Sequence, residues 1–237
     1  MSEEATIQVN FGRPMPIFPL NTVALLPHGV LPLNIFEERY RQMVSDALDG
    51  AGQIAMAVFE GDGWMQEYHA RPPVRPAVCV GQIIQHHKFP DGRYMVALQG
   101  ICRARITREL PASTDALYRR AMLEPVGIGD AEEEEERLGP HREHLSEMLA
   151  TPPLTDLRES PDIVQFLSEE GVPTSAILEL LTLRFLTDQG FRYHMLEEGD
   201  VVKRAGMVER EMNRLRHLLE AAAPQREAAW PKGMSWN

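Results

Sequence analysis

The sequence predicts an α+β fold in which strands and helices occupy separate halves of the chain. In the first half, short apolar runs alternate with Gly- and Pro-rich turns, and one segment of helical spacing interrupts them. In the second half, longer stretches repeat their apolar residues at intervals of three and four. The change falls near residue 127, so we expect a β-rich subdomain over 1–127, a helical subdomain over 128–223 and a tail over 224–237.

The composition limits the classes of function. With 237 residues, the chain is long enough to bury a core without covalent staples. It carries 24 Lys and Arg against 35 Asp and Glu, a net charge of −11 without a basic cluster, which argues against nucleic acid as a partner. No signal peptide or long apolar span is visible, so we expect no membrane contact.

Cysteine usage and the chain ends suggest a reducing compartment. Cys79 and Cys102 are too few for a disulfide framework or a zinc cage, and we interpret them as small core residues. We therefore expect a cytoplasmic protein without a cofactor. The tail holds Trp230 and Trp236, which makes docking of the tail on the body of the protein an option.

The first helix is expected directly after a series of prolines. Because proline cannot donate to a sheet ladder, the strands before the helix are expected at edges, first positions or irregular pairings. Asn34 and Glu37 have the spacing of a capping box, so we expect the helix to begin there and to end at Gly50. An ion pair between Glu37 and Arg39 is expected to hold the junction between strand and helix. The prolines are Pro16, Pro19, Pro27 and Pro32, and the residues expected on one helix face are Ile35, Phe36, Tyr40, Met43, Val44, Ala47 and Leu48.

A hairpin is the clearest element of the first half. It joins strands over 78–88 and 93–106, and Asp91 and Gly92 supply the positive φ angles of a two-residue turn. The register that follows pairs His87 with Val96, Gln85 with Leu98, Ile83 with Gly100 and Gly81 with Cys102.

The second half predicts a helical bundle. The acids of Glu132–Glu136 are typical of a solvated helix face near a helix start, and Gly139-Pro140 is expected to divide that helix. Residues 175–186 are apolar nearly all round and predict the buried centre of the bundle. Residues 201–222 repeat apolar positions at alternating intervals of four and three, which favours packing within the bundle, with self-association through this helix as the alternative.

Several stretches resemble the Lon protease N-terminal (substrate-binding) domain, which also occurs in stand-alone bacterial proteins and in cereblon. The resemblance covers about Pro14 to Ala223. It is carried by Phe18-Pro-Leu20, Leu26-Pro-His-Gly-Val-Leu-Pro-Leu33, Ile35-Phe-Glu-Glu-Arg-Tyr40, Lys88-Phe-Pro-Asp-Gly-Arg-Tyr94 and Leu98-Gln-Gly-Ile-Cys-Arg-Ala-Arg-Ile106. One departure is Glu38, where the family often carries proline, and either residue suits a first helical turn. The resemblance implies a PUA-like pseudo β-barrel followed by a helical bundle that ends in a long helix.

The function that this resemblance implies is a non-enzymatic protein- or peptide-binding module. Such a module recognises unfolded or damaged protein segments by apolar contact and works beside an ATP-dependent protease. The chain has no Gly-x-x-x-x-Gly-Lys-Ser/Thr loop and no Gly-x-Ser-x-Gly serine, so we expect the ATPase and protease parts to be absent. The alternative is an adaptor or assembly protein in a stable complex with one partner. A hydrolase would need a titratable cluster, which the sequence does not show.

Candidate contact residues lie in two exposed-looking places. Trp64, Met65 and Tyr68 fall in a loop, and Phe89 falls at the hairpin tip. No catalytic or metal-binding residue is expected, since neighbouring histidines such as His86 and His87 point to opposite faces of a strand. The residues expected to shape the scaffold are Asn34, Phe36, Glu37, Arg39, Tyr40, Asp91 and Gly92.

Overall fold

The computed structural model describes residues 8–227, except 24, 67–70 and 170. Contacts divide the chain into two compact units. The first holds the described residues up to Asp130 together with Thr187–Val201, and the second holds Ala131–Leu186 together with the described residues from Val202 onward. Residues 187–201, which fall in the helical half of the sequence, therefore pack with the strands of the first unit. The predicted tail tryptophans, Trp230 and Trp236, lie outside the described residues.

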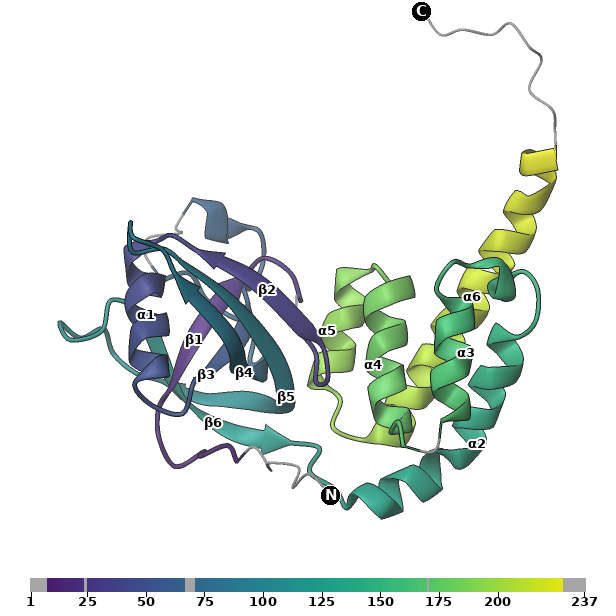
Figure 1. The fold of residues 1–237 in the computed structure, drawn as a ribbon, viewed down its shortest axis with the longest axis horizontal. Helices are drawn as coiled ribbons and strands as arrows, with labels where there is room; N and C mark the ends of the chain where they lie inside the picture. The colour runs from purple at the N-terminus through teal and green to yellow at the C-terminus, as the bar shows by residue number, and fades with distance from the viewer. Residues whose placement is uncertain (1–7, 24, 67–70, 170, 228–237) are drawn as a thin grey trace, which may run out of the picture. The chain divides into compact units, whose positions relative to one another are not determined.

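A six-stranded sheet forms the first unit and curls into a partial ring (Figure 1). The strand order is β2-β5-β4-β3-β1-β6, and β6 also pairs with β5. Pairings are antiparallel except between β1 and β3. The core inside the sheet includes Ile17, Val78, Val80 and Ala104. The strands are β1 (Met15–Leu20), β2 (Val30–Ile35), β3 (Gln53–Val58), β4 (Ala77–Lys88), β5 (Tyr94–Glu109) and β6 (Arg119–Val126).

The proline-rich strands differ in their position in the sheet. β2 contains Pro32 and pairs with β5 alone among the described strands, so it is an edge strand, where a missing N–H is tolerated. β1 contains Pro16 and Pro19 and lies between β3 and β6, but each proline is paired with one neighbouring strand only, Pro16 with β6 and Pro19 with β3, in keeping with the expected irregular pairing. Its antiparallel pairing with β6 covers only Met15–Ile17, while its parallel pairing with β3 covers Ile17–Leu20.

Helix α1 (Glu38–Leu48) begins later than the capping box predicts, so that prediction is wrong. Asn34 belongs to β2 and pairs with Met95, because the strand continues to Ile35 before the chain turns. Glu37 occupies the N-cap position without a side-chain cap, and its carboxylate instead accepts from Arg39 Nε at 3.1 Å. The expected Glu37–Arg39 ion pair is therefore present.

The helix face is also shorter than its pattern suggests. Tyr40, Met43, Val44 and Ala47 are buried as expected. Phe36, which the periodicity places on the buried face, is 63% exposed because it precedes the helix and does not follow its period.

The hairpin of β4 and β5 has a three-residue loop, and the predicted register is wrong. Phe89 N donates to Arg93 O at 2.9 Å, so Pro90, Asp91 and Gly92 form the loop, with Gly92 at φ 84°. A proline before Asp-Gly suits the first central position of a type I turn, and glycine then takes the left-handed position of the longer loop. The observed pairs are His87–Met95, Gln85–Ala97, Ile83–Leu98 and Gly81–Gly100, with irregularities between Val80 and Gly81 and between Ile83 and Gln85.

Helix α5 (Gln189–Glu197) is fastened to the sheet of the first unit. The Tyr193 hydroxyl accepts a hydrogen bond from Ala77 N at 2.9 Å, and the Arg75 guanidinium lies 3.1 Å from the centre of the Tyr193 ring. The buried Arg103 donates from Nε to the carbonyl oxygen of Met195 at 3.0 Å. These contacts explain why α5 belongs to the strands despite its place in the sequence.

Four helices form the second unit: α2 (Ala131–Leu149), α3 (Ser160–Ser168), α4 (Thr174–Phe185) and α6 (Val201–Glu227). Helix α2 runs through Pro140 without the predicted break, and the residues after the proline that it buries, Leu145, Met148 and Leu149, outweigh the lost hydrogen bond. Helix α4 is buried through Ile177, Leu178 and Leu181, as the sequence predicts.

The heptad of α6 is divided between buried and partly exposed positions. Its first four apolar positions, Val201, Ala205, Val208 and Met212, are buried, although Val201 belongs to the first unit and only the other three to the second. Leu218, in the later part of the helix, is 62% exposed. Two short 3₁₀ turns, η1 (Gly63–Met65) and η2 (Leu154–Asp156), complete the described elements, and none of the described helices is long and apolar enough to cross a membrane.

Candidate functional site

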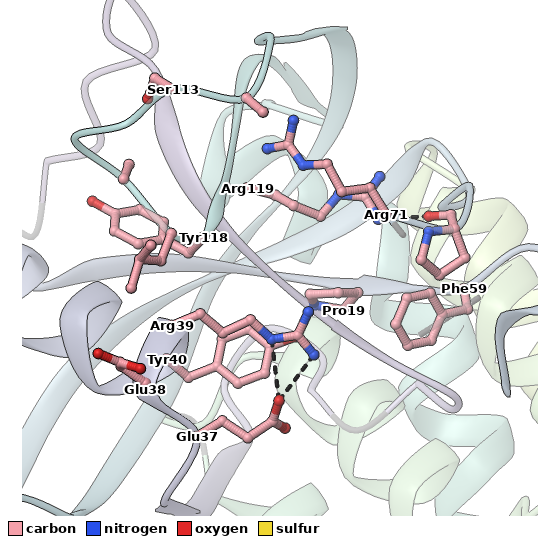
Figure 2. Close-up of a pocket in the computed structure, with 14 residues that line it drawn as sticks. Pro19, Glu37, Glu38, Arg39, Tyr40, Phe59, Arg71, Ser113, Tyr118 and Arg119 are labelled. Carbon is pink, nitrogen blue, oxygen red and sulfur yellow. Dashed lines mark hydrogen bonds and ion pairs between the residues drawn. The ribbon is translucent and has the colours of Figure 1, made fainter. Parts of the chain in front are cut away.

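The first unit contains a pocket of about 630 Å³ that opens beside the N-terminus of α1 (Figure 2). Five segments line it: the end of β1, residues 37–40, Phe59 after β3, residues 71–72, and the chain between β5 and β6. The sheet brings these segments together although they are distant in the sequence. The site is therefore a product of the barrel and not of one local motif.

Aromatic and proline side chains form much of the pocket wall. Tyr40, Phe59 and Tyr118 contribute rings, and Pro19 and Pro72 lie among them. Tyr40 is buried and packs against Phe18, with ring centres 4.4 Å apart. Rigid rings and prolines lose little conformational entropy on binding, so such a wall suits apolar side chains of a ligand.

Three guanidinium groups lie on the same wall (Figure 2). Arg39 lies 4.6 Å from the centre of the Tyr40 ring and forms an ion pair with Glu37 at 2.9 Å. Arg119 is 8% exposed and donates to both carboxylate oxygens of Glu109, at 2.8 and 2.6 Å. Arg71 lies 4.0 Å from the same Glu109 carboxylate. Arg39 is thus paired with Glu37, while Arg119 and Arg71 share the single carboxylate of Glu109.

The Tyr118 hydroxyl is anchored outside the aromatic wall. It donates to Asp46 Oδ2 of α1 at 2.9 Å, and Tyr118 is 7% exposed. Burial, with the Asp46 carboxylate as a second cause, raises the pKa of Tyr118 to about 12. The phenol is therefore neutral near pH 7 and acts as a hydrogen-bond donor.

One exposed apolar side chain lines the pocket, and two others lie next in sequence to residues at or beside it. Leu117 lines it and is 55% exposed, and Phe36 directly precedes the lining residue Glu37. Met65 is 67% exposed and follows Trp64, whose ring stacks on the lining residue Phe59 at 5.2 Å. Of these three residues, Leu117 is the one that the pocket lining itself includes.

The structure places the predicted contact residues differently. Trp64 lies next to the pocket through its stacking on Phe59, Met65 is exposed and is not among the lining residues, and Tyr68 lies outside the described residues. Phe89 is half-buried, packs edge-on against His87 at 4.7 Å, and is not among the pocket-lining residues. Sequence reasoning missed Leu117, Tyr118 and Arg119, since they follow an irregular segment without any periodic signal. Which of these residues bind a ligand stays a prediction.

A second exposed apolar face lies on the outer side of the sheet. Val30 on β2, Ile84 on β4 and Met95 on β5 are 57%, 44% and 53% exposed.

In the second unit, His141 Nδ1 lies 2.7 Å from Glu209 Oε1, so this histidine pairs with a carboxylate. In the part of the chain that the structure describes, no group of three His, Cys, Asp or Glu side chains is arranged to hold a metal ion.

A family model matches the chain over residues 14–214. The family is the substrate-binding domain of the ATP-dependent protease La (LON), and because the match spans most of the chain, the protein belongs to this family. The resemblance expected from the early proline-rich stretch and the hairpin is thereby confirmed.

Curated relatives are Lon proteases. The chain is 30% identical over 123 residues to the Lon protease of Escherichia coli K12, covering 51% of this chain and 15% of that protease. It is 26% identical over 221 residues to the Lon protease of Geobacter metallireducens, covering 91% of this chain and 25% of the protease. The chain thus matches no more than a quarter of the length of these two proteases.

Solved structures confirm the fold. A Lon N-terminal domain protein from Xanthomonas campestris aligns with a TM-score of 0.58 and 20% identity, covering 83% of this chain and 96% of that one. The N-terminal domain of a Mycobacterium avium complex Lon protease aligns with a TM-score of 0.62 and 18% identity, covering 85% and 98%. The mixed α+β class, a sheet in a partial ring plus helices, is confirmed.

Proposed function

We propose that the protein is a non-enzymatic protein- or peptide-binding module that holds unfolded or damaged segments by apolar contact at the pocket of the first unit. Family membership as a substrate-binding domain supports protein recognition in general. The observation that carries this particular site is the aromatic pocket with Leu117 exposed at its edge. Action beside an ATP-dependent protease in the cytoplasm is part of the same proposal.

The binding mode that the geometry favours is insertion of apolar side chains. The alternative mode adds a client strand to a free sheet edge through main-chain hydrogen bonds. The free edge of this sheet is β2, which carries Pro32 at its middle and therefore lacks one donor. We therefore expect a client segment to bind at the pocket, where rings and prolines offer apolar surface and no backbone pairing is needed.

The test is a titration of fluorescein-labelled, carboxymethylated α-lactalbumin, a permanently unfolded protein, followed by anisotropy. We expect saturable binding with a Kd in the micromolar range, which corresponds to a binding free energy on the order of −8 kcal/mol. Leu117→Ser should weaken it, since Leu117 is 55% exposed and its loss disturbs no core. Met95→Ser is the matched control, because Met95 is 53% exposed on the other face.

A Trp64→Ala, Tyr68→Ala variant examines the predicted loop contacts separately. Weaker binding in this variant would extend the site from the pocket to the loop. Equal loss in Leu117→Ser and Met95→Ser would remove the pocket as the site, and absence of binding by the natural chain would refute the function.

A second function, that of an adaptor in a stable complex, is favoured by the outer face with Val30, Ile84 and Met95. A permanent partner would cover these three exposed side chains, since obligate interfaces are rich in apolar residues. Met95→Asp should then release a stoichiometric partner that Leu117→Asp retains. Co-purification from cell extract, with both variants compared, decides between the two.

We also propose that the protein can self-associate through residues 201–222. The exposed Leu218 lies beside the late heptad positions Leu215 and Leu219. Analytical ultracentrifugation should show a concentration-dependent dimer that Leu218→Gln weakens, and an unchanged profile would remove this option.

A further inference from the structure

Two cavities of the first unit share one side chain. Beside the main pocket lies a second cavity of about 330 Å³, bordered by the start of β1 and the last turns of α1. Met15, Asp46 and Ala47 are among its lining residues. Tyr118 lines both cavities, so its side chain stands where the two meet.

The position of Tyr118 is held from the side of the second cavity. Its hydroxyl donates to Asp46 Oδ2 at 2.9 Å, and Asp46 belongs to α1, which packs on the sheet. The residue precedes β6 directly, where Arg119 is anchored to Glu109. A ring with one end bonded and its neighbour anchored cannot turn away freely, so it acts as a fixed wall.

From this arrangement we infer that Tyr118, positioned by Asp46, limits the depth to which the main pocket accepts an apolar side chain. The inference rests on the proposed function and adds a specificity-determining residue to it. Removing the ring takes away a side chain that borders both cavities, so a longer side chain can reach from the main pocket toward the second cavity and gain buried apolar area that a short one cannot use. Loss of the Tyr118 ring should therefore change the relative affinity for ligand side chains of different length.

The experiment compares two short Gly/Ser peptides as competitors of the labelled lactalbumin. One carries a central phenylalanine and the other a central 4-phenylphenylalanine, which adds a second ring in line with the first. For Tyr118→Ala we expect the affinity ratio to shift toward the longer side chain by about tenfold. Asp46→Ala should shift it in the same direction by less, since the ring remains but its anchor is lost.

The matched control is Asp49→Ala, which removes an exposed acid one turn from Asp46 that lines neither cavity. It should leave the ratio unchanged. Because Asp46 is exposed, its variant keeps every buried side chain and decides the matter if Tyr118→Ala fails to fold. An unchanged ratio in folded Tyr118→Ala or in Asp46→Ala overturns the inference. So does failure of both peptides to displace lactalbumin that the natural chain binds, whereas lack of lactalbumin binding refutes the proposed function itself.

Discussion

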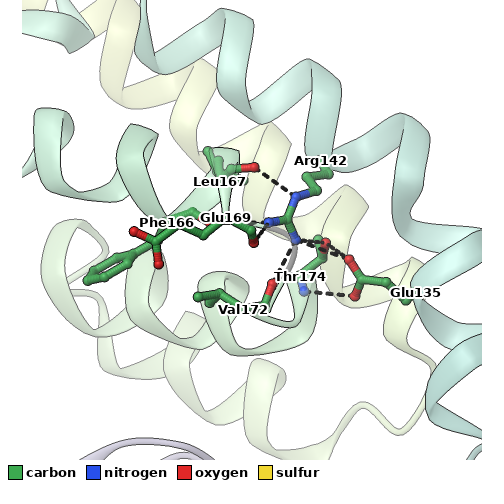
Figure 3. Close-up of polar contacts among 7 residues, drawn as sticks. All are labelled: Glu135, Arg142, Phe166, Leu167, Glu169, Val172 and Thr174. Atoms are coloured by element: carbon green, nitrogen blue, oxygen red, sulfur yellow. Dashed lines mark hydrogen bonds and ion pairs between the residues drawn. The ribbon is translucent and has the colours of Figure 1, made fainter.

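Arg142 and Glu135 lie seven residues apart on α2, and Arg142 Nη1 approaches Glu135 Oε1 to 3.1 Å (Figure 3). The Glu135 carboxylate also accepts from the backbone N–H of Thr174, the first residue of α4, at 2.8 Å. The Arg142 guanidinium donates to four carbonyl groups at and after the end of α3. These carbonyls belong to Phe166, Leu167, Glu169 and Val172.

The pair therefore joins two helix ends. A carboxylate at a helix N-terminus and a cation at a C-terminus are each favourable to the helix dipole. Here Glu135 satisfies the start of α4, whose own N-cap residue is Pro173 without a side-chain cap, and Arg142 satisfies the end of α3. One ion pair on α2 thus fixes the loop between the two helices.

We expect Arg142→Ala to destabilise the second unit by about 2–4 kcal/mol, because several carbonyl groups lose a charged donor at a side chain that is only 17% exposed. Urea unfolding followed by circular dichroism measures the change. Arg214→Ala is the control, since Arg214 is 74% exposed and its pairing with Glu211 at 3.8 Å is a surface contact. A loss no greater than that of Arg214→Ala would contradict the role of Arg142.

The stability of the first unit should depend on the guanidinium geometry of the Arg119–Glu109 pair. Arg119→Lys keeps the charge but cannot donate to both carboxylate oxygens and to Pro72 O together, so we expect a loss of about 2 kcal/mol. Arg120→Lys is the matched substitution at the next residue, which contacts Ser113 and Asp115 at the surface. Equal midpoints in thermal unfolding for both variants would disprove the prediction.

Gly100 cannot carry a side chain. A Cβ there would lie 2.1 Å from Leu26 O and 2.8 Å from Leu26 C, which are backbone atoms. Two backbone hydrogen bonds hold β5 against residues 28–29: His28 N donates to Gly100 O at 2.9 Å, and Gly100 N donates to Gly29 O at 2.8 Å. Gly100→Ala should therefore cost more than about 3 kcal/mol, as overpacking against backbone does at its upper end. Gly63→Ala, where no atom lies within 4 Å, should fold normally, and the soluble yield and urea midpoint compare the two.

Tyr118 makes the stability of the first unit fall in alkaline solution. Its pKa is about 12 in the folded protein against the ordinary value of 10.0. The unfolded chain therefore loses the phenolic proton first, so stability is retained below about pH 10 and declines between pH 10 and 12, by up to about 1.4 kcal/mol per pH unit.

Tyr118→Phe tests this dependence because it removes the titrating group and keeps the ring. The urea midpoint of the natural chain should approach that of the variant as the pH rises from 9 toward 12. A constant difference between the two proteins over this range would show that Tyr118 does not titrate as its surroundings imply.

Much of the fold follows from periodicity in the sequence. The buried strand at 53–58, the hairpin strands and the buried helix at 174–185 each have a pattern that local burial explains. The errors concern junctions, where the pattern is short. The capping box at Asn34 failed because pairing with β5 extends β2, and the hairpin register failed because Pro90 joins the loop.

The candidate site was predictable only in part. Trp64 and Met65 were proposed as contacts from their exposed-looking loop; the Trp64 ring stacks on the pocket residue Phe59, and whether either residue binds a ligand stays a prediction. Tyr118 and Leu117 follow no pattern, since they reach the pocket through the pairing of β6 with β1 and β5. A single sequence does not carry that information, because strand pairing joins residues that are distant along the chain.

The sequence by itself determined the α+β class, the order of strands before helices and the membership of the Lon substrate-binding family, because residue type and local spacing carry these properties. The tertiary structure decided that α5 joins the strands, that Glu135 and Arg142 tie two helix ends together, and that Tyr118 stands between two cavities. An acidic run predicts a solvated helix face, but the fold brings the start of α4 against Glu135, which accepts from Thr174 N. Residues that look alike in the sequence pattern therefore differ in function because of their long-range contacts.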